Sequence, residues 1–246
     1  MMRAGGRNIL RGCLEAAERM AGFTGRPRGG DGSEAAWMVE KQVRARGVRD
    51  PRVLASLREV PRHLFVPSEE REIAYSDQAL PIGEGQTISQ PYIVALMTEL
   101  LSPRPGDRIL EVGTGSGYQA AILASLGAEV FSLEIVPGLA RRAEDRLARL
   151  GFRGIRVRTG DGSSGWPEEA PFDGIMVTCA AGAVPEPLAG QLKEGGKMVI
   201  PLGKSLSFQD LTVATRLRGG KLGLETVTGV VFVPMTGPRG LAGNRE

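Results

Sequence analysis

Short apolar runs alternate with amphipathic stretches through the middle and later parts of the chain. Apolar runs of four to eight residues predict strands, whereas apolar residues recurring every three or four positions predict helices. Strands are predicted at 108–112, 129–134, 155–157, 173–178 and 197–201, and helices at 117–126, 137–150 and 187–192. This alternation is typical of an α/β fold with a doubly wound, mostly parallel sheet covered by helices on both faces.

The pattern changes near the C-terminus. Residues 209–216 and 227–233 read as two further strands, and the turn Arg218-Gly219-Gly220-Lys221 lies between them. Two strands joined by a short glycine-containing turn form an antiparallel pair. The sequence therefore predicts an antiparallel edge on the parallel sheet.

The pattern before residue 102 is helical and then polar. Helical spacing over 37–60 predicts two short helices, and Asp50-Pro51 is a plausible helix start. A polar, glycine-rich loop at 77–91 leads into a helix at 92–101. Loops of this length in a compact domain are often functional.

Composition places the chain among globular proteins. The 246 residues are 41% hydrophobic and 24% charged, and no apolar stretch is long enough to span a membrane. With no apolar signal segment either, we expect a protein that acts in the cytoplasm without a membrane partner. Only Cys13 and Cys179 are present, too few for a disulfide framework or a multi-cysteine metal site, so no metal is expected.

The basic charge is concentrated at one end. Residues 1–30 contain six arginines against two glutamates, whereas residues 31–246 hold 25 basic and 26 acidic side chains. The chain also lacks a basic stripe with interleaved aromatic residues, so no nucleic-acid partner is expected. Residues 1–33 are rich in glycine and arginine, and we expect a disordered basic tail there.

A glycine-rich turn carries the first chemical signal. It falls where a predicted strand gives way to a helix, so that backbone N–H groups can face a ligand. A dinucleotide-binding turn would need Gly or Ala at the position of Tyr118. The E-x-G-x-G-x-G pattern instead resembles the first motif of S-adenosylmethionine-dependent methyltransferases, while a tight turn without a ligand remains open. The candidate cofactor residues in this turn are Glu111, Gly113, Thr114, Gly115, Ser116 and Gly117.

Two acidic residues follow the next two strands. Glu134 lies 21 residues after Gly113, where a carboxylate can accept hydrogen bonds from both ribose hydroxyls of an adenosyl group. Asp161-Gly162 follows the third strand, where a carboxylate could accept a hydrogen bond from an adenine amino group. Each alone could be a solvated residue or a helix cap. Their order and spacing together favour an adenosyl ligand.

Longer motifs resemble one family within this superfamily. The run Leu80-Pro-Ile-Gly-Glu-Gly-Gln-Thr-Ile-Ser-Gln-Pro-Tyr92, the segment 97–101 and the run 110–121 closely resemble protein-L-isoaspartate O-methyltransferases. The Gly160-Asp-Gly162 and Val177-Thr-Cys-Ala-Ala181 segments do so as well. The resemblance spans roughly residues 37–236 and departs at Cys179, where a small residue such as alanine is expected. It implies a Rossmann-like methyltransferase domain over 34–246, with a helical cap and substrate loop at 34–101 and the cofactor-binding sheet at 102–246.

The resemblance also implies the reaction. Family members transfer a methyl group from S-adenosylmethionine to the free α-carboxylate of L-isoaspartyl residues in damaged proteins and peptides. The methyl ester then re-forms a succinimide, whose hydrolysis returns some normal aspartate. The attacking carboxylate has a pKa of about 4 and needs no general base. His63 is the only histidine, and we expect it to be structural.

The family match assigns the active-site position to Ser89. Its hydroxyl can donate a hydrogen bond to the incoming carboxylate, although a helix N-cap is an equally good local interpretation. Thr87 and Ile88 are expected to close over the cofactor, and Thr236 to border the peptide groove.

We expect a monomer. The alternatives are a methyltransferase acting on RNA or a small metabolite, a non-catalytic cofactor-binding protein of the same fold, and, more remotely, an NAD-dependent oxidoreductase.

Overall fold

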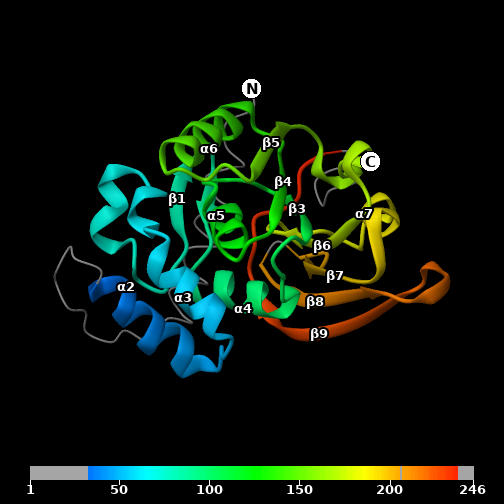
Figure 1. Ribbon diagram of the computed structural model, residues 1–246, viewed down its shortest axis with the longest axis horizontal. Helices are drawn as coiled ribbons and strands as arrows, with labels where there is room; N and C mark the ends of the chain where they lie inside the picture. Colours follow the sequence, from blue (N-terminus) through cyan, green and yellow to red (C-terminus); the bar gives the residue numbers. More distant parts are fainter. Residues whose placement is uncertain (1–32, 206, 238–246) are drawn as a thin grey trace.

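A computed structural model describes residues 33–205 and 207–237 of the chain. In this part, seven strands form one sheet in the order β5-β4-β3-β6-β7-β8-β9 (Figure 1). The first five strands in this order run parallel: β5 (Ile155–Thr159), β4 (Glu129–Glu134), β3 (Arg108–Val112), β6 (Phe172–Val177) and β7 (Leu192–Leu202). The last two, β8 (Gln209–Arg216) and β9 (Leu222–Val230), are antiparallel. The predicted α/β fold with an antiparallel edge is confirmed.

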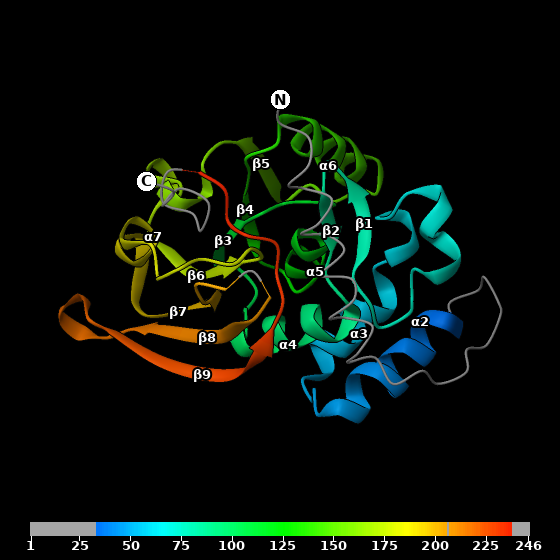
Figure 2. The same ribbon diagram turned by 180° about the vertical axis from the view of Figure 1, so that it is seen from behind.

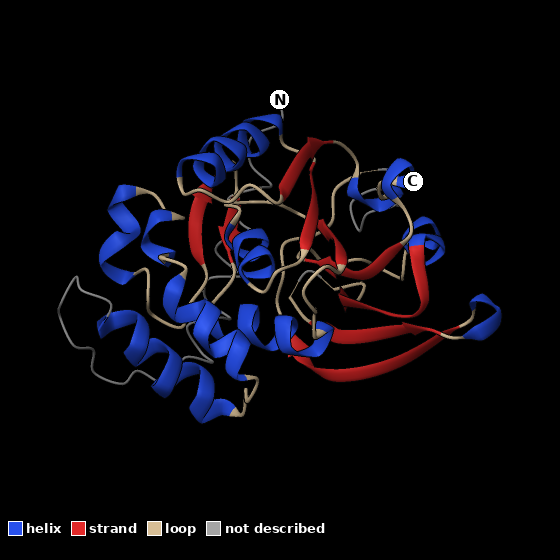
Figure 3. Ribbon diagram, viewed as in Figure 1, coloured by secondary structure: helices blue, strands red, loops and turns tan. Residues whose placement is uncertain are grey.

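Each face of the sheet packs on a different set of helices (Figure 3). Ile109 and Val130 point to the face that α4 (Pro91–Leu101) and α5 (Tyr118–Ser125) cover. The neighbouring residues Leu110 and Phe131 point to the other face, where α7 (Glu186–Gln191) contributes Leu188. α6 (Pro137–Arg149) follows β4 and packs on β5 and β4. Strands buried on both faces are near-continuous apolar runs, and for this reason the sequence marks them clearly.

A helical segment precedes the sheet. The two predicted helices are present as α2 (Ser33–Met38), which continues into the π-helical turn η1 (Val39–Val43), and α3 (Pro51–Glu59). The Asp50 side chain accepts a 2.8 Å hydrogen bond from the Arg52 N–H and caps α3, as the sequence predicts. Short 3-10 helices η2 (Arg44–Arg46), η3 (Arg62–Leu64) and η4 (Ser68–Ile73) complete the segment. One continuous apolar cluster joins these elements to α5 and α6.

The predicted loop at 77–91 is wrong in part. It contains two short antiparallel strands, β1 (Leu80–Gly83) and β2 (Gln86–Ile88), which pair Leu80 with Ile88. Glu84 and Gly85 between them have positive φ of 53° and 70°. Positive φ at both central residues is the geometry of a tight two-residue hairpin. Strands of three and four residues are too short to show an alternation of apolar and polar positions, so the sequence did not reveal them.

Two strand boundaries at the antiparallel edge also differ from prediction. The predicted strand 227–233 is shifted, because β9 begins at Leu222 and ends at Val230. Most of its residues are exposed, since β9 is the edge strand, and their polarity does not mark the start. β7 begins at Leu192, five residues before the predicted start, through a polar stretch at 193–197. The predicted turn at 218–221 does join β8 to β9, and it contains the single 3-10 turn η7 (Arg218–Gly220).

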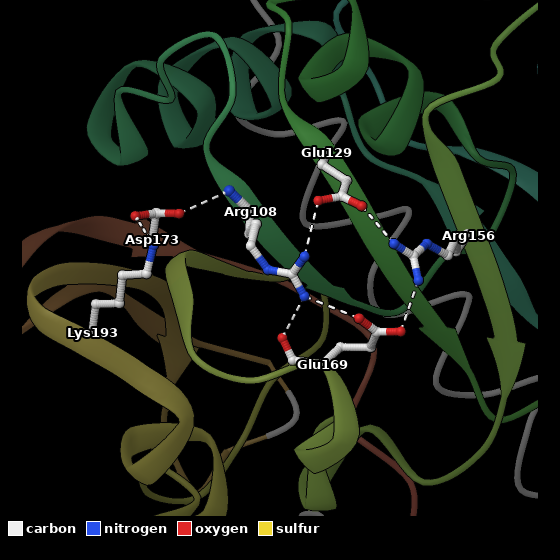
Figure 4. Close-up of polar contacts among 6 residues, drawn as sticks. All are labelled: Arg108, Glu129, Arg156, Glu169, Asp173 and Lys193. Atoms are coloured by element: carbon white, nitrogen blue, oxygen red, sulfur yellow. Dashed lines mark hydrogen bonds and ion pairs between the residues drawn. The ribbon is translucent and has the colours of Figure 1, made fainter.

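An ion-pair network lies at the amino ends of three strands (Figure 4). Arg108 and Arg156 each pair with both Glu129 and Glu169, at N–O distances of 2.5 to 3.0 Å. Both guanidinium groups also lie over the Phe131 ring, 4.5 and 4.6 Å from its centroid. The network fixes the edge of the sheet that faces away from the strands' carboxyl ends.

The predicted tail at 1–33 lies outside the described residues, apart from Ser33, which begins α2. Among the described helices, none has the length and apolar character that crossing a bilayer requires.

Candidate active site

A pocket lies at the carboxyl ends of β3, β4 and β6. In open α/β sheets, ligands bind at this edge, where loops from several strands meet. Segments far apart in the sequence form the wall, including β2 and the chain that follows β9. Six of the predicted site residues line the pocket: Thr87, Gly113, Gly115, Glu134, Gly162 and Thr236.

The first glycine of the turn is required by its surroundings. Gly113 has a φ of 100°, and a Cβ at this position would lie 2.4 Å from Thr178 Oγ1. That hydroxyl donates to the carbonyls of Val112, at 3.0 Å, and Gly113, at 2.7 Å. Any side chain would therefore displace the end of β6 as well as strain the backbone. Glycine here leaves the backbone open to a ligand in the pocket.

Glu134 joins the end of β4 to the glycine-rich turn. Its Oε2 accepts a 2.8 Å hydrogen bond from the Gly115 N–H, and its Oε1 accepts one of 3.0 Å from the Val136 N–H. The side chain is 5% exposed and lines the pocket. A carboxylate has about four lone-pair positions, so the two oxygens can still accept from the hydroxyls of a bound ligand.

Glu111 lies behind the turn rather than in the pocket wall. Its carboxyl is fully buried and accepts a short hydrogen bond from Ser132 Oγ. Ser132 in turn shares a 2.6 Å hydrogen bond with Thr114 Oγ1. Burial, with a smaller contribution from the nearby Glu134, raises the pKa of Glu111 to about 8. Glu111 and Thr114 thus support the turn from inside the protein.

Ser116 and Gly117 also shape the turn from within. Both are buried, and Ser116 Oγ accepts a hydrogen bond of 3.3 Å from the Tyr118 N–H. Gly117 has a φ of 85°, and a Cβ there would lie 3.2 Å from the Leu147 side chain of α6. Neither residue contributes to the pocket wall. Their contacts set the direction in which α5 leaves the turn.

Asp161 forms a cap after β5. Its carboxylate accepts hydrogen bonds of 2.9 Å from both the N–H and the hydroxyl of Ser163. Gly162 beside it lines the pocket, and a Cβ on Gly162 would lie 2.3 Å from a Val112 methyl carbon. A Cβ on Gly237 would lie 2.8 Å from Asp161 Oδ1, so the chain after β9 passes over this carboxylate.

Ser89 is half-buried and follows β2 directly. Thr87, two residues before it, lines the pocket, whereas Ser89 and the buried Ile88 do not. The N-cap position of α4 is Gln90, without a side-chain cap, so the interpretation of Ser89 as an N-cap is wrong. Asp77 instead supplies the acceptor for the helix, at 3.0 Å from the Tyr92 nitrogen.

His63 and Cys179 are the other side chains of chemical interest. His63 Nδ1 shares a 2.7 Å hydrogen bond with the Tyr75 hydroxyl, and burial lowers the pKa of His63. This fits the structural role predicted for it. Cys179 lines the pocket, and burial, with the nearby Glu134 charge, raises the pKa of its thiol to about 12. A thiol so weakly acidic is a poor nucleophile.

The sequence missed the other residues of the pocket wall. Several of them lie at or just after the carboxyl end of a strand, and they could have been predicted because ligands bind at that edge of an open α/β sheet. The segment after β9 could not be found this way, because it reaches the pocket through an isolated bridge between Ala180 and Pro234. The missed residues are Gln86, Val112, Leu133, Ile135, Val136, Thr178, Cys179, Val233, Pro234 and Met235.

The family model described as protein-L-isoaspartate(D-aspartate) O-methyltransferase matches residues 34–240. A protein-L-isoaspartate O-methyltransferase of Methanoculleus marisnigri is 54% identical over 206 residues, which cover 84% of this chain and 93% of that protein. One of Gloeobacter violaceus is 53% identical over 199 residues, 81% of this chain and 97% of that protein.

Two solved structures are similar in fold. A protein-L-isoaspartate O-methyltransferase aligns with a TM-score of 0.77 and 29% identity, covering 85% of this chain and 67% of that one. A putative protein-L-isoaspartate O-methyltransferase from Plasmodium falciparum, in complex with S-adenosyl-L-homocysteine, aligns with a TM-score of 0.71 and 26% identity. That alignment covers 82% of this chain and 98% of the other.

Proposed function

This chain belongs to the protein-L-isoaspartate O-methyltransferase family, and we propose that the pocket at the ends of β3 and β4 is where it binds S-adenosylmethionine for isoaspartyl repair. The enzyme transfers a methyl group from this cofactor to the free α-carboxylate of L-isoaspartyl residues in damaged proteins and peptides. The observation that supports the location best is the hydrogen bond between Glu134 and the Gly115 N–H, because it places a carboxylate beside a glycine turn open to a ligand.

The pocket residues fit an adenosyl group. Glu134 would accept hydrogen bonds from the ribose hydroxyls, since its carboxylate lines the pocket and keeps free lone pairs. The backbone at Gly113 and Gly115 would lie against the ligand, because neither carries a side chain. Gly162 would form part of the wall against the adenine. Asp161, which does not itself line the pocket but directly precedes Gly162, would be the acceptor for the adenine amino group.

The cofactor supplies an activated methyl group on a positively charged sulfur. The acceptor is a carboxylate already ionised at neutral pH, so the protein needs to supply no base. What remains is to align the carboxylate with the methyl group and to exclude water, which would stabilise the separated charges.

Ser89 is the residue that we assign to this alignment. Its hydroxyl can donate one hydrogen bond to the incoming carboxylate. Ser89 directly follows β2, and Thr87 within that strand lines the pocket. Thr87 and Ile88 would close over the cofactor from this side. Thr236 is exposed and lines the same pocket, so it would border the groove that receives the peptide.

The proposal includes a monomer that acts in the cytoplasm and binds neither nucleic acid nor membrane. Size-exclusion chromatography with light scattering would test the monomer.

A paired-peptide assay tests the proposed function. The purified protein is incubated with radiolabelled S-adenosylmethionine and two peptides that differ only in a normal or an isoaspartyl linkage. We expect base-labile label on the isoaspartyl peptide alone. Label on both peptides would favour a methyltransferase of another substrate class. Label on neither, with cofactor still bound, would favour a non-catalytic protein of the same fold.

A further inference from the structure

Arg62 is a fully buried cation close to the active-site segment. It is the only arginine among the described residues with no measurable exposure. Burial lowers the pKa of Arg62 to about 10, so the guanidinium still carries its charge at neutral pH. Burying a charge is unfavourable unless hydrogen bonds compensate for the lost water.

The guanidinium bonds to backbone rather than to a carboxylate. Its Nε donates to the Ala74 carbonyl at 2.7 Å, and a terminal nitrogen donates to the Ser89 carbonyl at 2.7 Å. Residues 74 and 89 flank the segment that contains the β1–β2 hairpin. Arg62 therefore ties together both ends of the segment that brings Thr87 into the pocket wall.

The same guanidinium contacts the start of α5. Its central carbon lies 5.0 Å from the centroid of the Tyr118 ring, and the ring packs edge-on against Phe65. Tyr118 directly follows Gly117, the last glycine of the cofactor turn. β1 lies beside α5 in Figures 1 and 2, and Leu80 of β1 and Ile88 of β2 belong to the same buried apolar cluster as Tyr118. One side chain thus contacts both the Tyr118 ring, at the start of the helix that follows the glycine-rich turn, and the backbone carbonyl of Ser89.

We propose that Arg62 is a positioning residue that holds Ser89 in place relative to the cofactor turn. This inference rests on the proposed function, because it concerns the alignment of the Ser89 hydroxyl with the reacting carboxylate. Charge-assisted hydrogen bonds to carbonyls are stronger than neutral ones, and their forked geometry fixes the acceptors in direction as well as distance. A lysine can keep the charge but cannot reproduce both bonds in the same geometry.

A double-mutant cycle separates positioning from general stability. The kcat for the isoaspartyl peptide is measured for wild type, R62M, S89A and the R62M/S89A double variant, each corrected for the fraction that binds S-adenosylhomocysteine. We expect R62M to lower kcat by about tenfold or more when Ser89 is present, because small misplacements at a reacting centre are costly. In the S89A background, we expect R62M to lower kcat by less than about threefold, because no hydroxyl remains to be positioned.

R62K and R58M complete the design. R62K is expected to recover part of the kcat lost in R62M, and it replaces R62M in the cycle if that variant does not fold. Arg58 lies exposed on α3 and pairs with Glu40, so R58M is expected to leave kcat unchanged. Equal losses from R62M in both backgrounds would overturn the inference. A wild-type protein that does not methylate the isoaspartyl peptide at all would instead contradict the proposed function.

Discussion

Glu134 Oε2 lies 2.8 Å from the backbone nitrogen of Gly115, and this contact ties the end of β4 to the glycine-rich turn. The other oxygen of the same carboxylate accepts from the Val136 N–H at 3.0 Å. The carboxylate therefore has a fixed orientation in the pocket wall before any hydroxyl approaches it. A preoriented acceptor loses little conformational freedom on binding a ligand.

Replacing Glu134 should weaken cofactor binding. Hydrogen bonds to a charged group contribute about 1.5–3 kcal/mol, so we expect E134A to raise the Kd for S-adenosylhomocysteine by about 10- to 100-fold. Isothermal titration calorimetry measures this directly. E129Q is the matched control, because Glu129 lies at the other end of the same strand and belongs to the ion-pair network. Equal weakening in both variants would contradict the role of Glu134.

Ser89→Ala should affect turnover rather than cofactor binding. The hydroxyl is proposed to bond to the substrate carboxylate, and Ser89 does not line the pocket. We expect kcat for the isoaspartyl peptide to fall by about 10- to 100-fold, while the Kd for S-adenosylhomocysteine changes by less than about threefold. A loss of cofactor affinity as large as that of E134A would show that Ser89 has a different role.

Gly113→Ala should destabilise the protein more than the same change at Gly47. Both glycines have a positive φ, 100° and 106°, so alanine is strained at either position. A Cβ on Gly47 meets nothing within 4 Å, whereas one on Gly113 would lie 2.4 Å from Thr178 Oγ1. We expect G47A to lower the free energy of unfolding by about 1–2 kcal/mol and G113A to lower it further. Urea unfolding measures both, and equal losses would mean that the turn can relax.

Glu111 should make stability depend on pH. The folded state keeps the Glu111 proton up to a pKa of about 8, whereas the unfolded chain releases it near 4.5. Between these values the folded state binds more protons, so stability falls as the pH rises and this loss is complete above about pH 8. E111Q removes the titrating group and can still bond to Ser132.

We therefore expect the melting temperature of E111Q, relative to that of wild type, to increase as the pH rises from 5 to 8. Differential scanning fluorimetry over this range provides the test. E144Q, at an exposed position on α6, is expected to follow the wild type throughout. A difference between E111Q and wild type that stays constant with pH would contradict the buried, protonated state.

The sequence predicted the buried strands well and the edges poorly. Ile109 to Val112 form a continuous apolar or buried run because β3 has neighbours on both sides and helices on both faces. β9 is partly buried at its first two residues and exposed from Leu224 to Thr228, so no alternation of apolar and polar residues marks its start. The β1–β2 hairpin depends on Glu84 adopting a positive φ, which a non-glycine residue rarely signals in sequence.

The sequence predicted those site residues that lie next to a strand it had also located. Gly113 and Glu134 lie at strand ends that the alternating pattern locates, and both line the pocket. Pro234 and Met235 escaped prediction because a long-range bridge to Ala180 brings them there. The sequence did not identify Arg62 either, because nothing in its local sequence indicates that it is buried against Ser89.

A crystal structure of the protein with S-adenosyl-L-homocysteine would test the central claim most directly, because that claim is the location of the cofactor. We predict the ribose hydroxyls within hydrogen-bond distance of the Glu134 carboxylate and the adenine beside Asp161 and Gly162. Adenosyl density bound away from both Glu134 and Asp161 would contradict the account.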